Sequence, residues 1–155
     1  MILRYLFLIM LIGLISCKAQ KEGNSLTGEA IEGLVLLDHD DFTSIDTFQT
    51  REIRDTKTLN KFYREINKTR KPGLPVPMVD FTKDMLVLVC LGEQQGKKEV
   101  ALSQLRYTET ELWIAVDVWE EDQEGTVAIQ PMYYPFYLYK MPLVDKSLHF
   151  QRVEK

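Results

Sequence analysis

The spacing of apolar residues changes along the chain, and each spacing predicts a different element. Residues 85–91 form a continuous apolar run, whereas side chains in residues 112–119 alternate between two faces. Between residues 59 and 66, apolar side chains recur three, four and seven positions apart. A short continuous run favours a strand covered on both faces, alternation favours an ordinary strand, and the third spacing favours an amphipathic helix. The pattern therefore predicts a sheet with a helix packed on it.

Strands dominate the predicted fold. The pattern places them, with turn residues between them, at residues 33–37, 45–53, 85–91, 100–106, 112–119, 127–129, 136–141 and 148–153. The fourth and fifth segments are joined at Thr108-Glu109-Thr110, which predicts a hairpin. In its second arm one face carries Leu112, Ile114, Val116 and Val118, and the other carries Trp113, Ala115, Asp117 and Trp119.

The single predicted helix starts after Asp55, whose carboxylate can accept hydrogen bonds from the first free backbone amides. Its apolar stripe consists of Leu59, Phe62, Tyr63 and Ile66. Residues 70–77 contain three prolines, which remove backbone donors and fix φ, so they form an extended connector. The resulting fold class is α+β: a mostly antiparallel β-sheet or sandwich-like domain with one principal helix.

The N-terminal residues have the layout of an export signal. Arg4 precedes an apolar run at residues 5–15, which is too short for a transmembrane helix of roughly 20 residues. The run ends in Leu14-Ile15-Ser16-Cys17, which resembles the bacterial lipobox. An ordinary secretory signal with a chance cysteine is the alternative.

These features predict how the chain is organised. We expect residues 1–16 to be a lipoprotein signal peptide, residues 17–28 to be the lipidated Cys17 with a polar tether, and residues 29–155 to form one globular domain. Lipid on Cys17 would hold the domain at a membrane of the bacterial cell envelope, facing the periplasm or the cell surface.

Charge and cysteine content narrow the functional classes. The chain has 23 acidic and 19 basic residues and a formal net charge of −4. Phosphate recognition needs a basic face, so no nucleic-acid binding is expected. Cys90 lies inside the apolar run of residues 85–91, so we expect a buried, inert thiol and a domain without a disulfide.

Side chains that could perform catalysis are few. The histidines are His39 and His149, and the chain contains no G-x-S-x-G elbow and no His or Cys pair at zinc spacing. We therefore expect no enzymatic activity, no catalytic residues, no metal and no cofactor. A hydrolase with a cryptic site would need one of these histidines beside a serine in a cleft.

Two acidic segments could attract a cation. Residues 38–41 read Asp-His-Asp-Asp, and alternating carboxylates in a loop can meet on one hard cation. Because their spacing differs from that of a calcium-binding loop, a solvated turn is the preferred interpretation. Residues 120–125 form a second acidic loop, which we also expect to be solvated.

The predicted helix has a basic side opposite its apolar stripe. Residues 51–71 hold eight basic and three acidic residues, and the candidate basic face consists of Lys57, Lys61, Arg64 and Lys68. This face could meet an acidic partner or anionic membrane headgroups. The alternative is a solvated helix face, partly paired between Lys61 and Glu65.

Aromatic residues cluster in the second half of the chain. Tryptophan and tyrosine dominate the energetic centres of protein interfaces, and they also dominate cores. The candidate protein-binding residues are Trp113, Trp119, Tyr133, Tyr134, Tyr137 and Tyr139. Either these side chains form an exposed binding face, or they pack beneath the helix or in a second small core layer.

Three blocks of sequence carry a family resemblance. They are residues 51–63 (REIRDTKTLNKFY), residues 77–85 (PMVDFTKDM) with the following strand and Gly92, and residues 134–142 (YPFYLYKMP). In order and spacing they resemble the PrcB-like family, named after a small lipoprotein subunit of a bacterial surface protease complex. Of the Gly-Gly-Tyr pattern common after the central strand in that family, only Gly96 matches here. The resemblance implies a non-catalytic accessory or stabilising subunit that binds another exported protein.

Together these features predict a lipid-anchored, extracytoplasmic protein-binding module that assists, stabilises or modulates an exported protease. Its partners would be that exported protein and, through the lipid on Cys17, the membrane. The second hypothesis is a small-ligand or glycan-binding lipoprotein that uses an aromatic face. A concave aromatic pocket would favour the second hypothesis.

Overall fold

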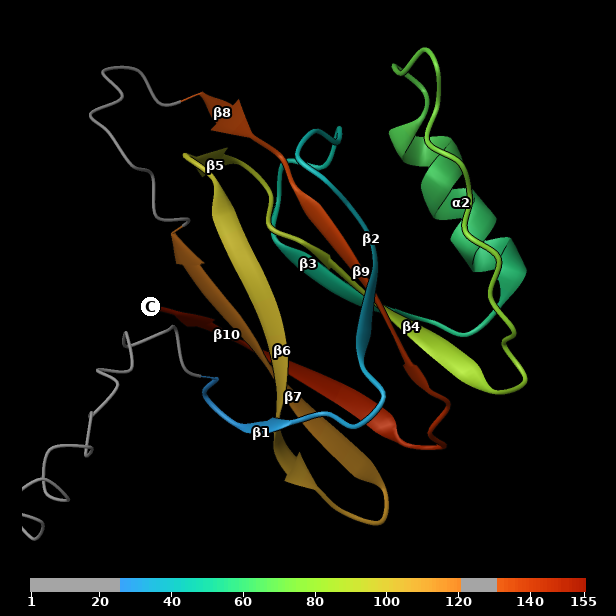
Figure 1. Ribbon diagram of the computed structural model, residues 1–155, viewed down its shortest axis with the longest axis vertical. Helices are drawn as coiled ribbons and strands as arrows, with labels where there is room; N and C mark the ends of the chain where they lie inside the picture. The colour runs from blue at the N-terminus through green and yellow to red at the C-terminus, as the bar shows by residue number, and fades with distance from the viewer. Residues whose placement is uncertain (1–25, 121–130) are drawn as a thin grey trace, which may run out of the picture.

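In the described residues, two four-stranded β-sheets and helix α2 are stacked in three layers (Figure 1). The structure is a computed structural model and describes residues 26–120 and 131–155. Its elements are β1 (Glu29–Ala30), β2 (Val35–Asp40), β3 (Gln49–Ile53), α2 (Thr56–Ile66), β4 (Asp84–Cys90), β5 (Gln94–Gln95), β6 (Lys98–Tyr107), β7 (Glu111–Glu120), β8 (Met132–Tyr133), β9 (Phe136–Pro142) and β10 (Ser147–Glu154). The predicted α+β class, with a mostly antiparallel sheet and one principal helix, is confirmed.

The strands form two four-stranded sheets and one small ribbon. Sheet A has the order β1-β6-β7-β10, sheet B has the order β2-β9-β4-β3, and β5 pairs with β8. All these pairs are antiparallel except β7 with β10, which run parallel. The predicted hairpin is present as β6 and β7, with a register shift between Gln104 and Arg106.

The core between the two sheets is built from alternate side chains of the long strands. Leu112, Ile114, Val116 and Val118 of β7 all point into it, as their alternation predicts. Met85, Val87 and Val89 contribute from β4 of sheet B. The other face of β7, which carries Trp113 and Trp119, is therefore the outer face of sheet A.

Helix α2 covers the opposite face of sheet B. Its predicted apolar stripe, residues 59–66, packs against Leu86, Leu88 and Cys90 of β4. Strand β4 is thus covered on both faces, which explains its uninterrupted apolar sequence. Burial raises the pKa of the Cys90 thiol to about 12, so the reactive thiolate is scarce at neutral pH.

Local hydrogen bonds set both ends of α2. The Asp55 carboxylate accepts from the Thr58 backbone amide at 2.8 Å and from the Thr58 hydroxyl, and these bonds lower the pKa of Asp55. After the helix, the Asn67 side chain bonds both the amide and the carbonyl of Leu74, at 2.8 and 2.9 Å. This clamp turns the chain into the proline-rich connector that leads to β4.

Hydrogen bonds from side chains connect the layers of the sandwich at two places. On one side, the hydroxyls of Tyr137 and Tyr139 in β9 donate to the carbonyls of Lys98 and Val100 in β6, the second at 2.6 Å. On the other side, Arg54 donates to the carbonyls of Val144 and Lys146 at 2.7 and 2.9 Å. The first set of bonds connects sheet B to sheet A. The second connects the residue after β3 to the segment before β10.

Several elements differ from the predicted ones. The strand expected at residues 45–53 begins only at Gln49, and the segment between the strands expected at residues 85–91 and 100–106 contains β5. Strand β1 was not predicted, and the strand expected at residues 127–129 lies outside the described residues, as do the signal peptide and Cys17. Within the described residues, no helix is long and apolar enough to cross a membrane.

Candidate protein-binding surface

The six candidate aromatic residues do not form one face. Tyr137 and Tyr139 lie in the core between the sheets, 6% and 5% exposed, so for these two residues the core-packing alternative applies and neither belongs to an exposed binding face. Strand β9 is covered on both sides, and each of its two alternating sets of side chains enters a core. Trp113 and Trp119 lie on the outer face of sheet A, and Tyr133 and Tyr134 lie at or just after β8.

Trp113 is enclosed by its neighbours on the outer face of sheet A. The His149 ring from β10 stacks on the indole with centroids 4.5 Å apart, and the Arg106 guanidinium from β6 lies 5.0 Å from it. Strand β7 lies between β6 and β10, so these two groups approach from opposite sides. The indole nitrogen donates to Glu111 at 3.2 Å. A sugar ring would therefore have to displace a neighbour before it could stack on Trp113.

Trp119 lies at the other end of the same face. Its indole nitrogen donates to Glu99 at 2.7 Å. Six residues of strand separate the two tryptophans, which is roughly 20 Å at 3.3 Å per residue. Ala115 and Asp117, which lie between them on this face, are fully buried. The two indoles therefore do not form one continuous stacking platform.

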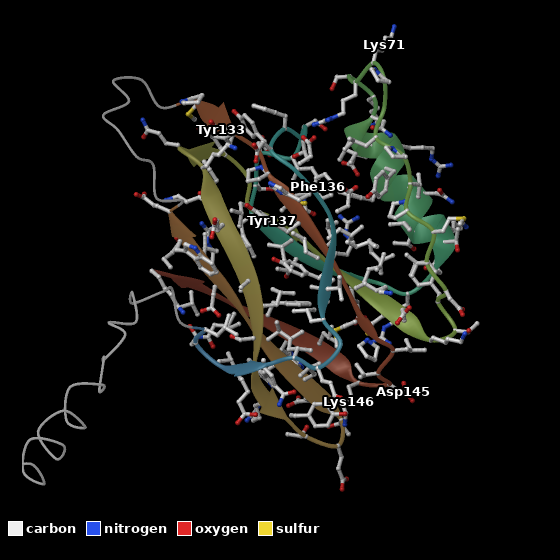
Figure 2. All side chains as sticks on the ribbon, in the orientation of Figure 1. Lys71, Tyr133, Phe136, Tyr137, Asp145 and Lys146 are labelled. Atoms are coloured by element: carbon white, nitrogen blue, oxygen red, sulfur yellow. The ribbon has the colours of Figure 1, made fainter. Side chains whose placement is uncertain are left out.

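A different aromatic pair, of which one ring is exposed, lies at the end of the sandwich where β8 lies. The Phe42 ring stacks on Tyr133 with centroids 5.7 Å apart, and Phe42 and the neighbouring residue Met132 are 56% and 44% exposed. We call Phe42, Met132 and Tyr133 the Phe42 surface; Tyr133 is labelled in Figure 2. Sequence analysis found Tyr133 but missed Phe42, which follows the acidic segment in a loop without periodicity.

An ion pair and two hydrogen bonds fix the backbone of the loop that carries Phe42. The Phe42 backbone amide donates to the Asp40 carboxylate at 2.8 Å. Arg70, which follows α2, pairs with that carboxylate and also donates to the Phe42 carbonyl. The Arg70 and Asp40 side chains are only 21% and 22% exposed. These contacts fix the backbone while leaving the Phe42 ring in solvent.

Backbone hydrogen bonds also connect this loop to Tyr134, the residue after β8. The amide of Thr43 donates to the carbonyl of Tyr134, and the amide of Tyr134 donates to the carbonyl of Asp41, both at 2.9 Å. The Tyr134 hydroxyl donates to Glu93 at 2.7 Å, and this hydrogen bond to a carboxylate raises the pKa of Tyr134. The Phe42 surface therefore lies on a loop that hydrogen bonds already hold in place. Less conformational entropy of the loop is then lost when a partner binds.

The acidic segment at residues 38–41 uses its carboxylates within the fold. Asp38 accepts from the Tyr63 hydroxyl, and burial together with this bond raises the pKa of Tyr63. Asp41 lies 3.2 Å from the His39 ring and 3.4 Å from Lys97. Among the described residues there is no group of three His, Cys, Asp or Glu side chains placed to hold a metal ion.

The candidate basic face lies on the outermost layer of the fold. Lys57, Lys61, Arg64 and Lys68 are all exposed; the first three lie on the side of α2 opposite the sheet, and Lys68 follows the helix. None of the four takes part in an ion pair among the described residues, and the pair expected between Lys61 and Glu65 is absent from them. This face and the Phe42 surface are separate features.

The histidines have structural neighbours. His39 stacks on Tyr137 with centroids 4.3 Å apart, and its Nδ1 lies 2.8 Å from the Phe136 carbonyl. His149 stacks on Trp113 and lies 3.6 Å from Glu111. These contacts give both rings a role in packing strands together.

No protein-family model, no curated protein and no solved structure matches this chain.

Proposed function

We propose that this chain is a lipid-anchored, extracytoplasmic protein-binding module, and that it binds its partner through the Phe42 surface. The observation that carries the proposal is the exposure of Phe42 on a loop fixed by Arg70 and Asp40. Exposing a large aromatic ring to water is unfavourable in the free protein, and a partner that covers it recovers that free energy. Phenylalanine and tyrosine are enriched in protein interfaces relative to the rest of the surface.

The shape of the Phe42 surface supports a protein partner more than a small ligand. Small-molecule sites are concave and enclose most of the ligand. Cavities of about 480, 290 and 480 Å³ in the described part of the chain are lined by residues outside the Phe42 surface. An apolar recess on an exported protein is the partner chemistry that fits this projecting ring. That the partner is a protease, which this subunit stabilises or modulates, rests on the family resemblance.

Removing both aromatic rings of the Phe42 surface should abolish partner capture. In intact cells, cross-linking and affinity capture with wild type should enrich one exported protein, and Phe42→Ala combined with Tyr133→Ala should lose it. With the purified partner, Phe42→Ala should weaken binding by about 30-fold, the effect of a 2 kcal/mol hot spot. Calorimetric titration of the wild type and the variants measures this change.

Met78→Ala is the matched control for that experiment. Met78 is 98% exposed, lies in the connector after α2, and is not part of the Phe42 surface. Met78→Ala removes more exposed apolar side-chain surface than Met132→Ala would, and it should leave partner capture unchanged. Equal capture by all variants would exclude the Phe42 surface, and loss by Met78→Ala as well would indicate non-specific adhesion.

The membrane anchor is tested separately, because Cys17 lies outside the described residues. Cys17→Ala should move the protein from the membrane fraction to the soluble fraction, since acyl chains contribute about 0.8 kcal/mol per buried CH₂ group. Fractionation followed by immunoblotting measures the shift, with Ser25→Ala as the control substitution. Retention of Cys17→Ala on membranes after a high-salt wash would contradict lipid anchoring.

A further inference from the structure

We infer a second binding site, for a ligand with an apolar body and an amino or guanidinium end group, in the cavity between the two sheets at the end of the sandwich opposite the Phe42 surface. The cavity has a volume of about 480 Å³, within the range of small-molecule sites. Figure 2 labels Tyr133 at one end of the molecule and Lys146, near this cavity, at the other. The site is therefore independent of the proposed function.

The floor of this cavity belongs to the hydrophobic core. Leu112 and Met141, which line it, are 1% and 2% exposed and pack in the core between the sheets. Val144 and Ile31 form part of its walls and pack against the same core. An apolar group that enters the cavity would contact core side chains directly, and this burial supplies the main favourable contribution to binding.

Gln104 is a polar residue at a position that points inward. In β6, Val100 and Leu102 face the core, and Gln104 continues their alternation opposite Ile114. It lines the cavity, and no side-chain hydrogen bond of Gln104 is found among the described residues. A polar side chain where the strand pattern calls for an apolar one often marks a functional site. Here its amide is free to bond a ligand.

Glu32 and Tyr107 provide further polar groups at the rim. Both line the cavity and are exposed, and the ion pairs of the described residues do not involve Glu32. The nearby cation Lys146 is engaged elsewhere: its ammonium group lies 4.2 Å from the Tyr107 ring centroid and donates to the carbonyls of Thr108 and Glu109. Glu32 thus provides the carboxyl group of the lining, and it selects a cationic end on the ligand.

The ligand chemistry can be tested with matched probes that share a phenyl ring. Titration of the ¹⁵N-labelled full chain with phenethylamine should shift the amide signals of Gln104, Leu112 and Met141, with a Kd of about 1 mM for a ligand of this size. Phenylacetate should bind at least about tenfold more weakly because Glu32 repels it. The absence of any saturable shift with phenethylamine, or equal binding of phenylacetate, would overturn the inference.

Variants locate the site and separate binding from folding. Glu32→Gln should weaken phenethylamine binding about tenfold. Glu109 has an exposed carboxyl group in the turn between β6 and β7, and Glu109→Gln should leave phenethylamine binding unchanged. Gln104→Leu should also weaken binding while keeping or raising the urea midpoint, because it restores an apolar residue at an inward position. Unchanged binding in both Glu32→Gln and Gln104→Leu would overturn the assignment.

The same chemistry can come from a free amine or from a polypeptide. A second titration uses acetyl-Phe-Lys-amide, which presents an aromatic ring and an ammonium group on a peptide backbone. Tighter binding of this peptide than of phenethylamine supports a polypeptide as the natural source, and tighter binding of phenethylamine supports a free amine. Both results require the Glu32 dependence described above, and binding that does not depend on Glu32 counts against the site.

Discussion

Replacing Asp117 with alanine should lower the free energy of unfolding by about 3 kcal/mol, the cost of breaking a buried, fully hydrogen-bonded ion pair. Asp117 is fully buried on the outer face of sheet A. Its carboxylate accepts from the Thr27 amide at 3.1 Å, from the Thr27 hydroxyl, and from Ser103 at 2.8 Å. It also lies 3.0 Å from the ammonium group of Lys155. One side chain thus fastens both ends of the described chain to β7.

Urea unfolding of wild type and Asp117→Ala measures this loss. Glu99→Gln is the matched control, since Glu99 lies on the same face but is exposed and bonds only Trp119 among the described residues. Its effect should stay below about 0.5 kcal/mol, as is usual for surface substitutions. Unfolding of Asp117→Ala at the wild-type urea midpoint would show that the carboxylate does not fasten the ends of the chain.

The same carboxylate should make stability depend on pH in the acid range. Burial raises the pKa of Asp117, but the hydrogen bonds from Thr27, Lys155 and Ser103 outweigh it, and the pKa falls below its ordinary value of 3.8. Its stabilisation is therefore complete above that value and is lost as pH falls through the lower pKa of the folded state. The difference in stability between wild type and Asp117→Ala should accordingly shrink below about pH 4.

Replacing Gly28 with alanine should have a comparable effect, about 2–3 kcal/mol, through steric overlap with the backbone. A Cβ atom at Gly28 would lie 2.7 Å from the carbonyl carbon of Gln104 and closer still to its oxygen. Backbone atoms in β6 cannot rotate away, so β1 would have to leave the sheet. Gly28 also donates its amide to Ser103 at 3.0 Å, and its displacement would pull Thr27 away from Asp117.

A double-mutant cycle tests this linkage. The loss in Gly28→Ala/Asp117→Ala should be smaller than the sum of the single losses, because both substitutions release the same segment. Gly73→Ala is the control, since the three atoms nearest to its Cβ would be side-chain atoms of Asn67, the closest at 3.0 Å, and it should cost less than Gly28→Ala. Strict additivity in the cycle would show that Gly28 and Asp117 act independently.

Local sequence patterns identified the elements whose burial follows a simple period. Helix α2 begins after Asp55 and buries the predicted stripe, and β4 lies centrally as its continuous apolar run predicts. Hairpin β6–β7 is also correct, because each arm is long and its turn is polar. In each case, neighbours in the sequence are enough to define which side chains point together.

The candidate site followed from sequence only in part. Tyr133 belongs to the Phe42 surface, but Tyr137 and Tyr139, a few residues later, are core residues. Strand β9 is apolar on both faces, so its alternation cannot show which side chains are exposed. Phe42 lies in a loop whose position depends on Arg70, a residue 28 positions later in the chain, and no local pattern signals that contact.

By itself, the sequence determined the α+β composition, the helix, the central strand and the hairpin, because periodic burial is a local property of a chain. The tertiary structure decided which aromatic rings reach solvent, the parallel pairing of β10 with β7, and the burial of Asp117 beneath Thr27. These features depend on segments far apart in the sequence meeting in space. In the sequence, Asp117 is an ordinary polar residue of an alternating strand. Only folding brings it into contact with Thr27, 90 residues earlier, and with Lys155 at the end of the chain.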